Sequence, residues 1–282
     1  MFQDFNTLLQ IKKYSSNTIR SYIGLLQVFQ DFLGFQMPME RLEDYYLFQK
    51  LGELILTKSY VYTTQKQLLS AVKLYLLEMH KREVDFKKLQ PRAPQQVLPQ
   101  ILSLEEVTLL LNRTTNSKHK AMLTVVYSLG LRSGELIQLK ISDFDKHRNC
   151  VFISQAKGRK DRILPYPDAL KSILRAYYLE YKPSNYLFEG QKKETYTTGS
   201  LRAVFNAACK RAGITKQVTC HNLRHSYATH LLEAGTNLKV IQNLLGHTNI
   251  KTTLLYTRVS DRSIVNTSSP LDFLKLDHEK VS

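Results

Sequence analysis

The chain has 282 residues, which is long enough for two domains with separate hydrophobic cores. Its 40 Lys and Arg exceed its 24 Asp and Glu by 16, and this surplus favours a polyanionic partner such as nucleic acid over a basic protein that binds none. The three cysteines lack C-x-x-C spacing, so they predict neither a disulfide framework nor a zinc ribbon, and no segment approaches the ~18 apolar residues of a membrane span. We therefore expect a cytoplasmic protein with reduced thiols and no membrane partner.

Residues 1–90 should form a helical bundle, because their apolar side chains recur every three or four positions. The polar run 15–18 offers N-caps for a helix that continues to Leu33. Two further helices are expected over Leu42–Leu56 and Tyr60–Met79. A bundle of this kind needs no ligand, so its exposed lysines are either solvated or in contact with a phosphate.

A proline-rich segment separates this bundle from the rest of the chain. Gln90–Gln100 contains three prolines and no periodicity, which is typical of a linker, and Ser103 and Glu106 then have the spacing of a helix capping box. Up to Pro99, 13 basic and 9 acidic residues give +4, and the remaining 27 and 15 give +12, so the second part should carry most phosphate contacts. The predicted organisation is an N-terminal helical domain over 1–90, a linker over 91–100, a second domain over 101–262 and a tail over 263–282.

The motif G-L-R-S-G-E-L places Arg132 beside a helix N-terminus. Gly130 should end one helix, and Ser133 should cap the next. Free amides and the helix dipole favour an anion there, and a guanidinium adds a planar fork for phosphate oxygens. An ion pair of Arg132 with Glu135 or Asp143 that only holds the turn explains the pattern equally well.

Two short strands with a basic turn follow. Cys150–Ser154 and Arg162–Leu164 flank a turn in which Gly158 suits a hairpin. The turn is either an ordinary exposed basic loop or a hairpin that brings a lysine to DNA.

The stretch Thr219–Arg258 combines four histidines, an early arginine and a late tyrosine. Its apolar spacing predicts three helices, which begin near Thr219, Thr236 and Thr248 and are separated by Gly235 and Gly246. The second helix should bury four apolar side chains, namely Val240, Ile241, Leu244 and Leu245.

Three positions in this stretch suit chemistry rather than packing. His221 and Arg224 are three residues apart, so they project from the same side of the first helical turn. His247 lies at the break after the second helix, and Tyr256 lies on the third helix.

Together these motifs resemble the tyrosine recombinase (phage integrase) family, and in particular its Xer and integron-integrase members. The matching segments are H-N-L-R-H-S-Y-A-T-H-L-L from His221, L-L-G-H from Leu244, T-T-x-x-Y-T from Thr252, G-L-R-S-G-E-L from Gly130 and K-G-R-K-D-R-x-L-P from Lys157. The resemblance is clear over about Ser103–Val259 and only general before Gln90. It implies a mainly α fold with a small β-hairpin or sheet, divided into a SAM-like helical core-binding domain and an α+β catalytic domain.

Every catalytic position of the family is matched, and the implied residues are Arg132, Lys157, His221, Arg224, His247 and Tyr256. By this resemblance Tyr256 is the nucleophile, His221 is the candidate base, and Lys157 protonates the departing 5′ oxygen. Lys160 competes with Lys157 for that role because both lie in the hairpin. The candidates for contact with the DNA backbone are Lys66, Lys73, Lys160 and Arg162, and Glu135 is expected to orient the catalytic groups.

The resemblance implies cleavage and rejoining of a double-stranded DNA target site through a 3′-phosphotyrosyl intermediate and a Holliday junction. It implies no cofactor and no metal, a homotetramer on synapsed DNA, and a C-terminal tail exchanged between protomers. Accessory DNA-bending or directionality proteins are further partners of such enzymes, and mobile-element transfer is among the roles.

Three other functions stay open on the residues alone. One is a DNA-binding protein with an inactive site, and another is a type IB topoisomerase that nicks and closes DNA. The third is a metal-dependent hydrolase, because His221 and His225 are an i,i+4 pair that suits zinc. Residue 222 is Asn rather than an acidic partner, which disfavours the hydrolase.

Overall fold

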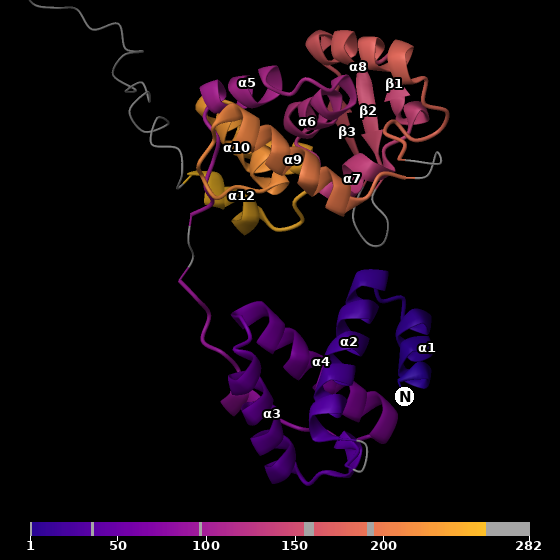
Figure 1. Ribbon diagram of the computed structural model, residues 1–282, viewed down its shortest axis with the longest axis vertical. Helices are drawn as coiled ribbons and strands as arrows, with labels where there is room; N and C mark the ends of the chain where they lie inside the picture. The colour runs from indigo at the N-terminus through magenta and orange to yellow at the C-terminus, as the bar shows by residue number, and fades with distance from the viewer. Residues whose placement is uncertain (1, 35–36, 96–97, 155–160, 191–194, 258–282) are drawn as a thin grey trace, which may run out of the picture. The chain divides into compact units, whose positions relative to one another are not determined.

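The computed structural model describes residues 2–34, 37–95, 98–154, 161–190 and 195–257. The chain divides into two compact units, Met1–Gln96 and Val97–Ser282, which are treated separately and called the N-terminal and C-terminal units (Figure 1). Within the described residues, no helix is long and apolar enough to cross a membrane.

The N-terminal unit is a bundle of α-helices, as its apolar spacing predicts. The helices are α1 (Gln3–Ile11), α2 (Ser16–Leu33), α3 (Asp44–Lys58) and α4 (Tyr62–His80), with short 3-10 turns at Met39–Arg41 and Lys87–Leu89. The Ser15 side chain caps α2 by accepting a hydrogen bond from the backbone N–H of Thr18. Helix α2 packs against α1, α3 and α4, and fully buried Leu26 and Phe29 place its apolar face in the shared core.

The C-terminal unit is also mainly helical. Its helices are α5 (Leu104–Asn112), α6 (Ser117–Leu129), α7 (Ser133–Gln138), α8 (Asp168–Tyr181), α9 (Thr198–Ala212), α10 (Cys220–Glu233), α11 (Leu238–Leu245) and α12 (Ile250–Thr257). Helix α6 is apolar on most sides and packs against α5, α8 and α10, so it forms the centre of this unit. Ser103 and Glu106 form the predicted capping box at the start of α5.

A small antiparallel sheet lies beside these helices (Figure 1). Its strands are β1 (Phe144–Asp145), β2 (Cys150–Ile153) and β3 (Arg162–Pro165), in the order β1-β2-β3. Val151 pairs with Leu164 and both are buried, whereas Phe152 and Ile163 face outward. The predicted hairpin is therefore present, and the mainly α fold with a small sheet is confirmed; β1 was not predicted because two residues carry no periodicity. The hairpin turn 155–160 lies outside the described residues.

One expected helix cap is wrong. Ser133 is the first residue of α7, and Arg132 occupies the cap position, where its backbone N–H donates to the Glu135 carboxylate at 2.8 Å. Helix α11 begins close to the predicted start near Thr236, and Asn237 caps it, because its side-chain oxygen accepts from the backbone N–H of Lys239. The expected burial of Val240 is wrong, because this side chain is 47% exposed.

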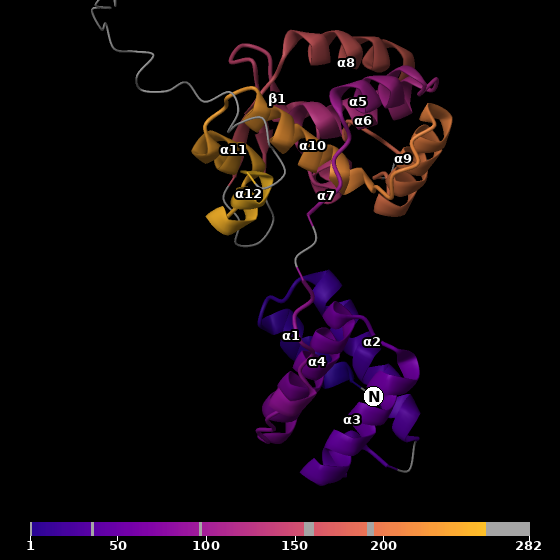
Figure 2. The same cartoon turned by 90° about the vertical axis from the view of Figure 1, so that its left-hand side faces the viewer.

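Helices α10, α11 and α12 are the three helices predicted within the stretch Thr219–Arg258, and they pack against one another (Figure 2). Gly246 adopts a left-handed conformation with φ of 61° and ends α11, which lets the chain turn back toward α12. His247 thus lies in the turn between two helices, and Tyr256 lies in the last turn of the described chain.

Candidate active site

Arg224 is anchored in the interior of the C-terminal unit. It lies one turn into α10, whose first turn is closed by reciprocal contacts between Thr219 and Asn222. Its guanidinium is fully buried and donates to the carbonyl oxygens of Gly130 at 2.6 Å and Leu245 at 2.5 Å. Burial and the nearby charge of Arg132 lower the pKa of Arg224 to about 9, so the side chain stays positive at neutral pH. Its buried Nε has no hydrogen-bond partner among the described residues.

The Glu135 carboxylate holds two further arginines beside Arg224. It accepts from Nη1 of Arg132 at 2.7 Å and from Nη1 and Nη2 of Arg162 at 3.0 and 2.7 Å, and it lies 3.7 Å from Nη1 of Arg224. Burial would raise the pKa of Glu135, but the Arg162 and Arg132 contacts outweigh it and lower that pKa to about 2. One carboxylate therefore balances one of three guanidiniums, and the excess positive charge favours an anion.

Arg162 does not agree with the expected contact to the DNA backbone. Only 6% of its side chain is exposed, and besides its two bonds to Glu135 it donates from Nε to the Leu244 carbonyl at 2.7 Å. These contacts occupy all three of its nitrogens inside the protein. The alternation of β3 explains the position, because Arg162 and Leu164 face the interior while Ile163 faces outward.

Tyr256 is buried beside the arginines. It is 1% exposed, and its hydroxyl lies 3.1 Å from Nδ1 of His225. The ring of His247 stacks on its ring, with centroids 6.3 Å apart and an interplanar angle of 14°. Burial raises the pKa of the Tyr256 hydroxyl, and the charges of Arg224 and Arg132 oppose that rise.

The histidines around Tyr256 are held neutral. Burial, followed by the charges of Arg224 and Arg132, lowers the pKa of His247 to about 3, and its Nδ1 lies 3.0 Å from the hydroxyl of Thr253. His221 is exposed, yet the protein atoms around its ring and the charges of the same two arginines lower its pKa as well. Neutral rings can accept or donate hydrogen bonds without adding to the positive charge.

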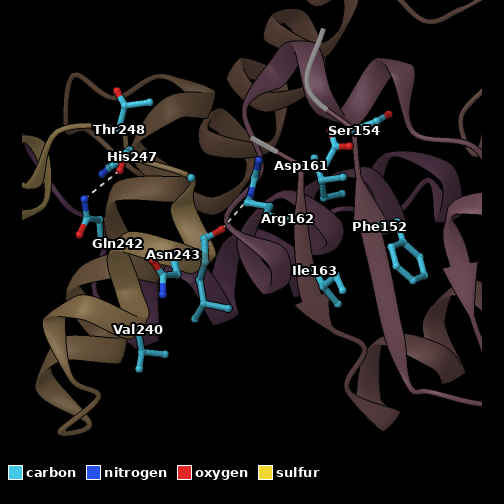
Figure 3. Close-up of a pocket in the computed structure, with 13 residues that line it drawn as sticks. Phe152, Ser154, Asp161, Arg162, Ile163, Val240, Gln242, Asn243, His247 and Thr248 are labelled. Carbon is cyan, nitrogen blue, oxygen red and sulfur yellow. Dashed lines mark hydrogen bonds between the residues drawn. The ribbon is translucent and has the colours of Figure 1, made fainter. Parts of the chain in front are cut away.

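A pocket borders the site on the side of the sheet (Figure 3). Its walls come from β2 and β3 on one side and from α11 and the turn after it on the other. Figure 3 shows Arg162 crossing between these walls to the α11 backbone, and Gln242 bonded to the His247 carbonyl at 3.0 Å. These two contacts fix the turn that carries His247.

Five of the six expected catalytic residues therefore gather in one cluster, namely Arg132, His221, Arg224, His247 and Tyr256. Lys157 and the competing Lys160 lie outside the described residues. Lys66 and Lys73 are exposed on α4. The sequence does not predict the contact of His225 with Tyr256: the spacing of His225 from His221 suits a zinc pair, and no sequence pattern indicates the tyrosine as its partner.

Residues 95–263, which are more than half of the chain, match the sequence model of the phage integrase family. The chain belongs to the phage integrase family. A tyrosine recombinase from Thermosipho africanus is 32% identical over 272 residues, which cover 93% of this chain and 95% of that protein. The putative integrase/recombinase y4qK of Sinorhizobium fredii is 41% identical over 188 residues, which cover 65% of this chain and 60% of that protein.

Solved structures give the same family. A crystal structure of XerA recombinase superposes with a TM-score of 0.55 at 28% identity and covers 93% of this chain and 94% of that one. A lambda integrase tetramer bound to a Holliday junction has a TM-score of 0.73 over 95% of this chain and 78% of that one, and at 17% identity it shows the fold. The resemblance to Xer-like tyrosine recombinases is confirmed, and the chain is a tyrosine-type site-specific recombinase.

Proposed function

We propose that this recombinase binds a DNA phosphodiester at Arg132 and Arg224 and cleaves it with Tyr256 as nucleophile. One observation carries this proposal: Tyr256 is buried on α12, which packs on the helix that carries Arg224, and the charges of Arg224 and Arg132 of the same chain oppose the rise that burial causes in the pKa of its hydroxyl. The largely buried Glu135 carboxylate holds Arg132 in place, and two carbonyl oxygens hold Arg224, so both guanidiniums are oriented before a ligand arrives. The two positive charges neutralise the nonbridging oxygens and the charge that builds on them in the transition state.

The covalent step exchanges one ester for another. His221, the base that the family resemblance implies, takes the proton of the Tyr256 hydroxyl. Oη then attacks phosphorus, a 3′-phosphotyrosyl bond forms, and the bond from phosphorus to the 5′ oxygen breaks. Lys157 supplies the proton that the departing 5′ oxygen takes up, as the family resemblance implies. His247 donates a hydrogen bond to a nonbridging oxygen. Because the phosphotyrosyl ester retains the bond energy of the cleaved phosphodiester, a 5′ hydroxyl from a second strand can reverse the step without ATP or a metal.

We further propose that four copies act on two synapsed duplexes and pass through a Holliday junction. The tetramer and junction of lambda integrase, which shares the fold, support this assembly. In this assembly the N-terminal unit is the core-binding domain, and Lys66 and Lys73 contact the backbone of the target site. The tail 263–282, which lies outside the described residues, is exchanged between protomers as the family resemblance implies. The protein would act on cytoplasmic DNA, with accessory DNA-bending or directionality proteins as further partners.

A covalent-trapping assay tests the proposal. Nicked duplexes that carry a candidate target from DNA flanking the gene are incubated with protein and run on denaturing gels, with the Tyr256→Phe variant and an EDTA arm in parallel. A protein–DNA adduct that survives EDTA and is absent from the variant is the expected result. Tight and specific binding to that DNA with no adduct would instead favour a DNA-binding protein with an inactive site.

A further inference from the structure

The Tyr256 hydroxyl has a partner outside the six expected catalytic residues. Nδ1 of His225 lies 3.1 Å from Oη, and the two ring centroids are 5.7 Å apart. His221, the expected base, instead packs in a T-shaped arrangement with the His225 ring, with centroids 4.5 Å apart and planes at 83°. Among the described residues, no hydrogen bond joins His221 to Tyr256.

The direction of this hydrogen bond follows from the protonation states. Burial, with the charges of His221 and Arg224, lowers the pKa of His225 to about 4, so the ring is neutral near pH 7. Burial raises the pKa of Tyr256, so the phenol keeps its proton in the free protein. Tyr256 therefore donates and Nδ1 of His225 accepts, which places the ring hydrogen of His225 on Nε2.

We infer that His225 is a positioning residue for the nucleophile: it accepts the hydrogen bond of the Tyr256 hydroxyl and thereby fixes the direction of the remaining lone pairs of Oη, one of which attacks phosphorus. This inference rests on the proposed role of Tyr256. It adds His225 to the site, so that α10 carries both a phosphate-binding arginine and the acceptor for the nucleophile.

Helix α10 is suited to this task because it also carries the phosphate-binding arginine. His225 directly follows Arg224, whose guanidinium is fixed by two backbone carbonyls. The acceptor for the nucleophile and the ligand for the phosphate thus move together, and α10 packs directly on α12, which carries Tyr256. A nucleophile that loses this acceptor can rotate away from phosphorus, and a misplacement of about 1 Å costs on the order of 100-fold in rate.

The chain offers a matched control on the same helix. Nδ1 of His230 lies 2.8 Å from the hydroxyl of Tyr127, so His230 and Tyr127 form a second histidine–tyrosine pair that lacks the nucleophile. The variants His225→Phe, His225→Asn and His230→Phe separate positioning from packing. Phe fills the space without an acceptor, whereas the Asn side-chain oxygen replaces Nδ1 as an acceptor but cannot take up a proton.

Single-turnover cleavage at saturating protein, DNA affinity and urea unfolding are measured for each variant. We expect His225→Phe to cleave about 100-fold more slowly with unchanged DNA affinity. His225→Asn should stay within about 10-fold of the wild-type rate, the effect of one weakened hydrogen bond, and His230→Phe should cleave near the wild-type rate even if it is less stable. The inference fails if His225→Phe cleaves at the wild-type rate, or if a folded, DNA-binding His225→Asn is as slow as His225→Phe.

Nitrogen-15 NMR of the free protein tests the hydrogen bond without cleavage. The Nδ1 signal of His225 should shift in the Tyr256→Phe variant, because the donor is lost. If the signal is the same in wild type and Tyr256→Phe, the inference is contradicted, regardless of the cleavage rates. If the signal differs between wild type and Tyr256→Phe but the wild type forms no adduct, the hydrogen bond is supported and the proposed function is contradicted. Failure of this inference and failure of the proposed function therefore give different results.

Discussion

Arg162 and Glu135 form a buried bidentate ion pair that links β3 to α7. The guanidinium donates to both carboxylate oxygens, at 3.0 and 2.7 Å, and the two side chains are only 6% and 11% exposed. Because Glu135 also accepts from Arg132, the pair connects the sheet to a phosphate-binding arginine. The position of Arg132 therefore depends on a contact to a strand 27 residues further along the chain.

The first prediction concerns the charge of Glu135. Glu135→Gln leaves Arg132, Arg162 and Arg224 without their shared carboxylate and should lower the free energy of unfolding by about 3–5 kcal/mol, as breaking a buried pair does. Urea unfolding measures the loss, and Asp168→Asn is the control, because it removes the carboxylate of an exposed pair with Lys171 and should change stability little. Equal losses of stability in the two variants would show that the Glu135 carboxylate contributes no more to stability than an exposed ion pair.

The second prediction concerns acid stability. The pKa of Glu135 is about 2 in the folded chain against an ordinary value near 4.5, so its ionised form is favoured by folding. Its contribution is fully present above about pH 4.5 and is lost as the pH falls toward 2. Unfolding free energies of wild type and Glu135→Gln, measured from pH 6 to pH 2, should converge in that window. Parallel curves would contradict the assigned pKa.

Gly130 gives a third prediction. Its φ is 58°, and an added Cβ would lie 2.4 and 2.6 Å from ring carbons of the buried Tyr227. Gly130→Ala should destabilise the fold by about 2–5 kcal/mol, from backbone strain and overpacking together, and should slow cleavage because the Gly130 carbonyl holds Arg224. Thermal unfolding and single-turnover cleavage report the two effects.

Gly213→Ala is the matched control for Gly130→Ala. Gly213 has a φ of 69°, but no atom lies within 4 Å of an added Cβ, so only the backbone strain of about 1–2 kcal/mol applies. Cleavage by this variant should be unchanged. If both variants lose the same stability, the close approach of the added Cβ to the Tyr227 ring does not contribute to the loss.

The fourth prediction separates the two hairpin lysines. Lys157→Ala should slow cleavage by about 100- to 10,000-fold, the range of general acid catalysis, whereas Lys160→Ala should mainly weaken DNA binding. Replacing the leaving 5′ oxygen by sulfur should restore cleavage by Lys157→Ala, because a thiolate leaves without a proton. A rate loss in Lys160→Ala that sulfur restores would assign the acid to Lys160.

The helices and their ends were largely predictable from the sequence, because they depend on local chemistry. Apolar spacing predicted α2 to α4 and α10 to α12 within a few residues, and Ser103 and Gly246 had the cap chemistry their positions require. The cap expected at Ser133 is wrong because the Glu135 carboxylate accepts from the backbone N–H of Arg132, so that α7 begins at Ser133 and Arg132 precedes it.

By itself, the sequence determined the family and the mainly helical fold, because these follow from motifs and from apolar spacings that are local in the chain. Tertiary structure alone decided which side chains touch. Arg162 turned inward to Glu135 because strand pairing places alternate residues in the core. His225, rather than His221, contacts the Tyr256 hydroxyl because of the way α10 packs on α12. These two helices are separated in the sequence by α11, and no local sequence pattern encodes how they pack.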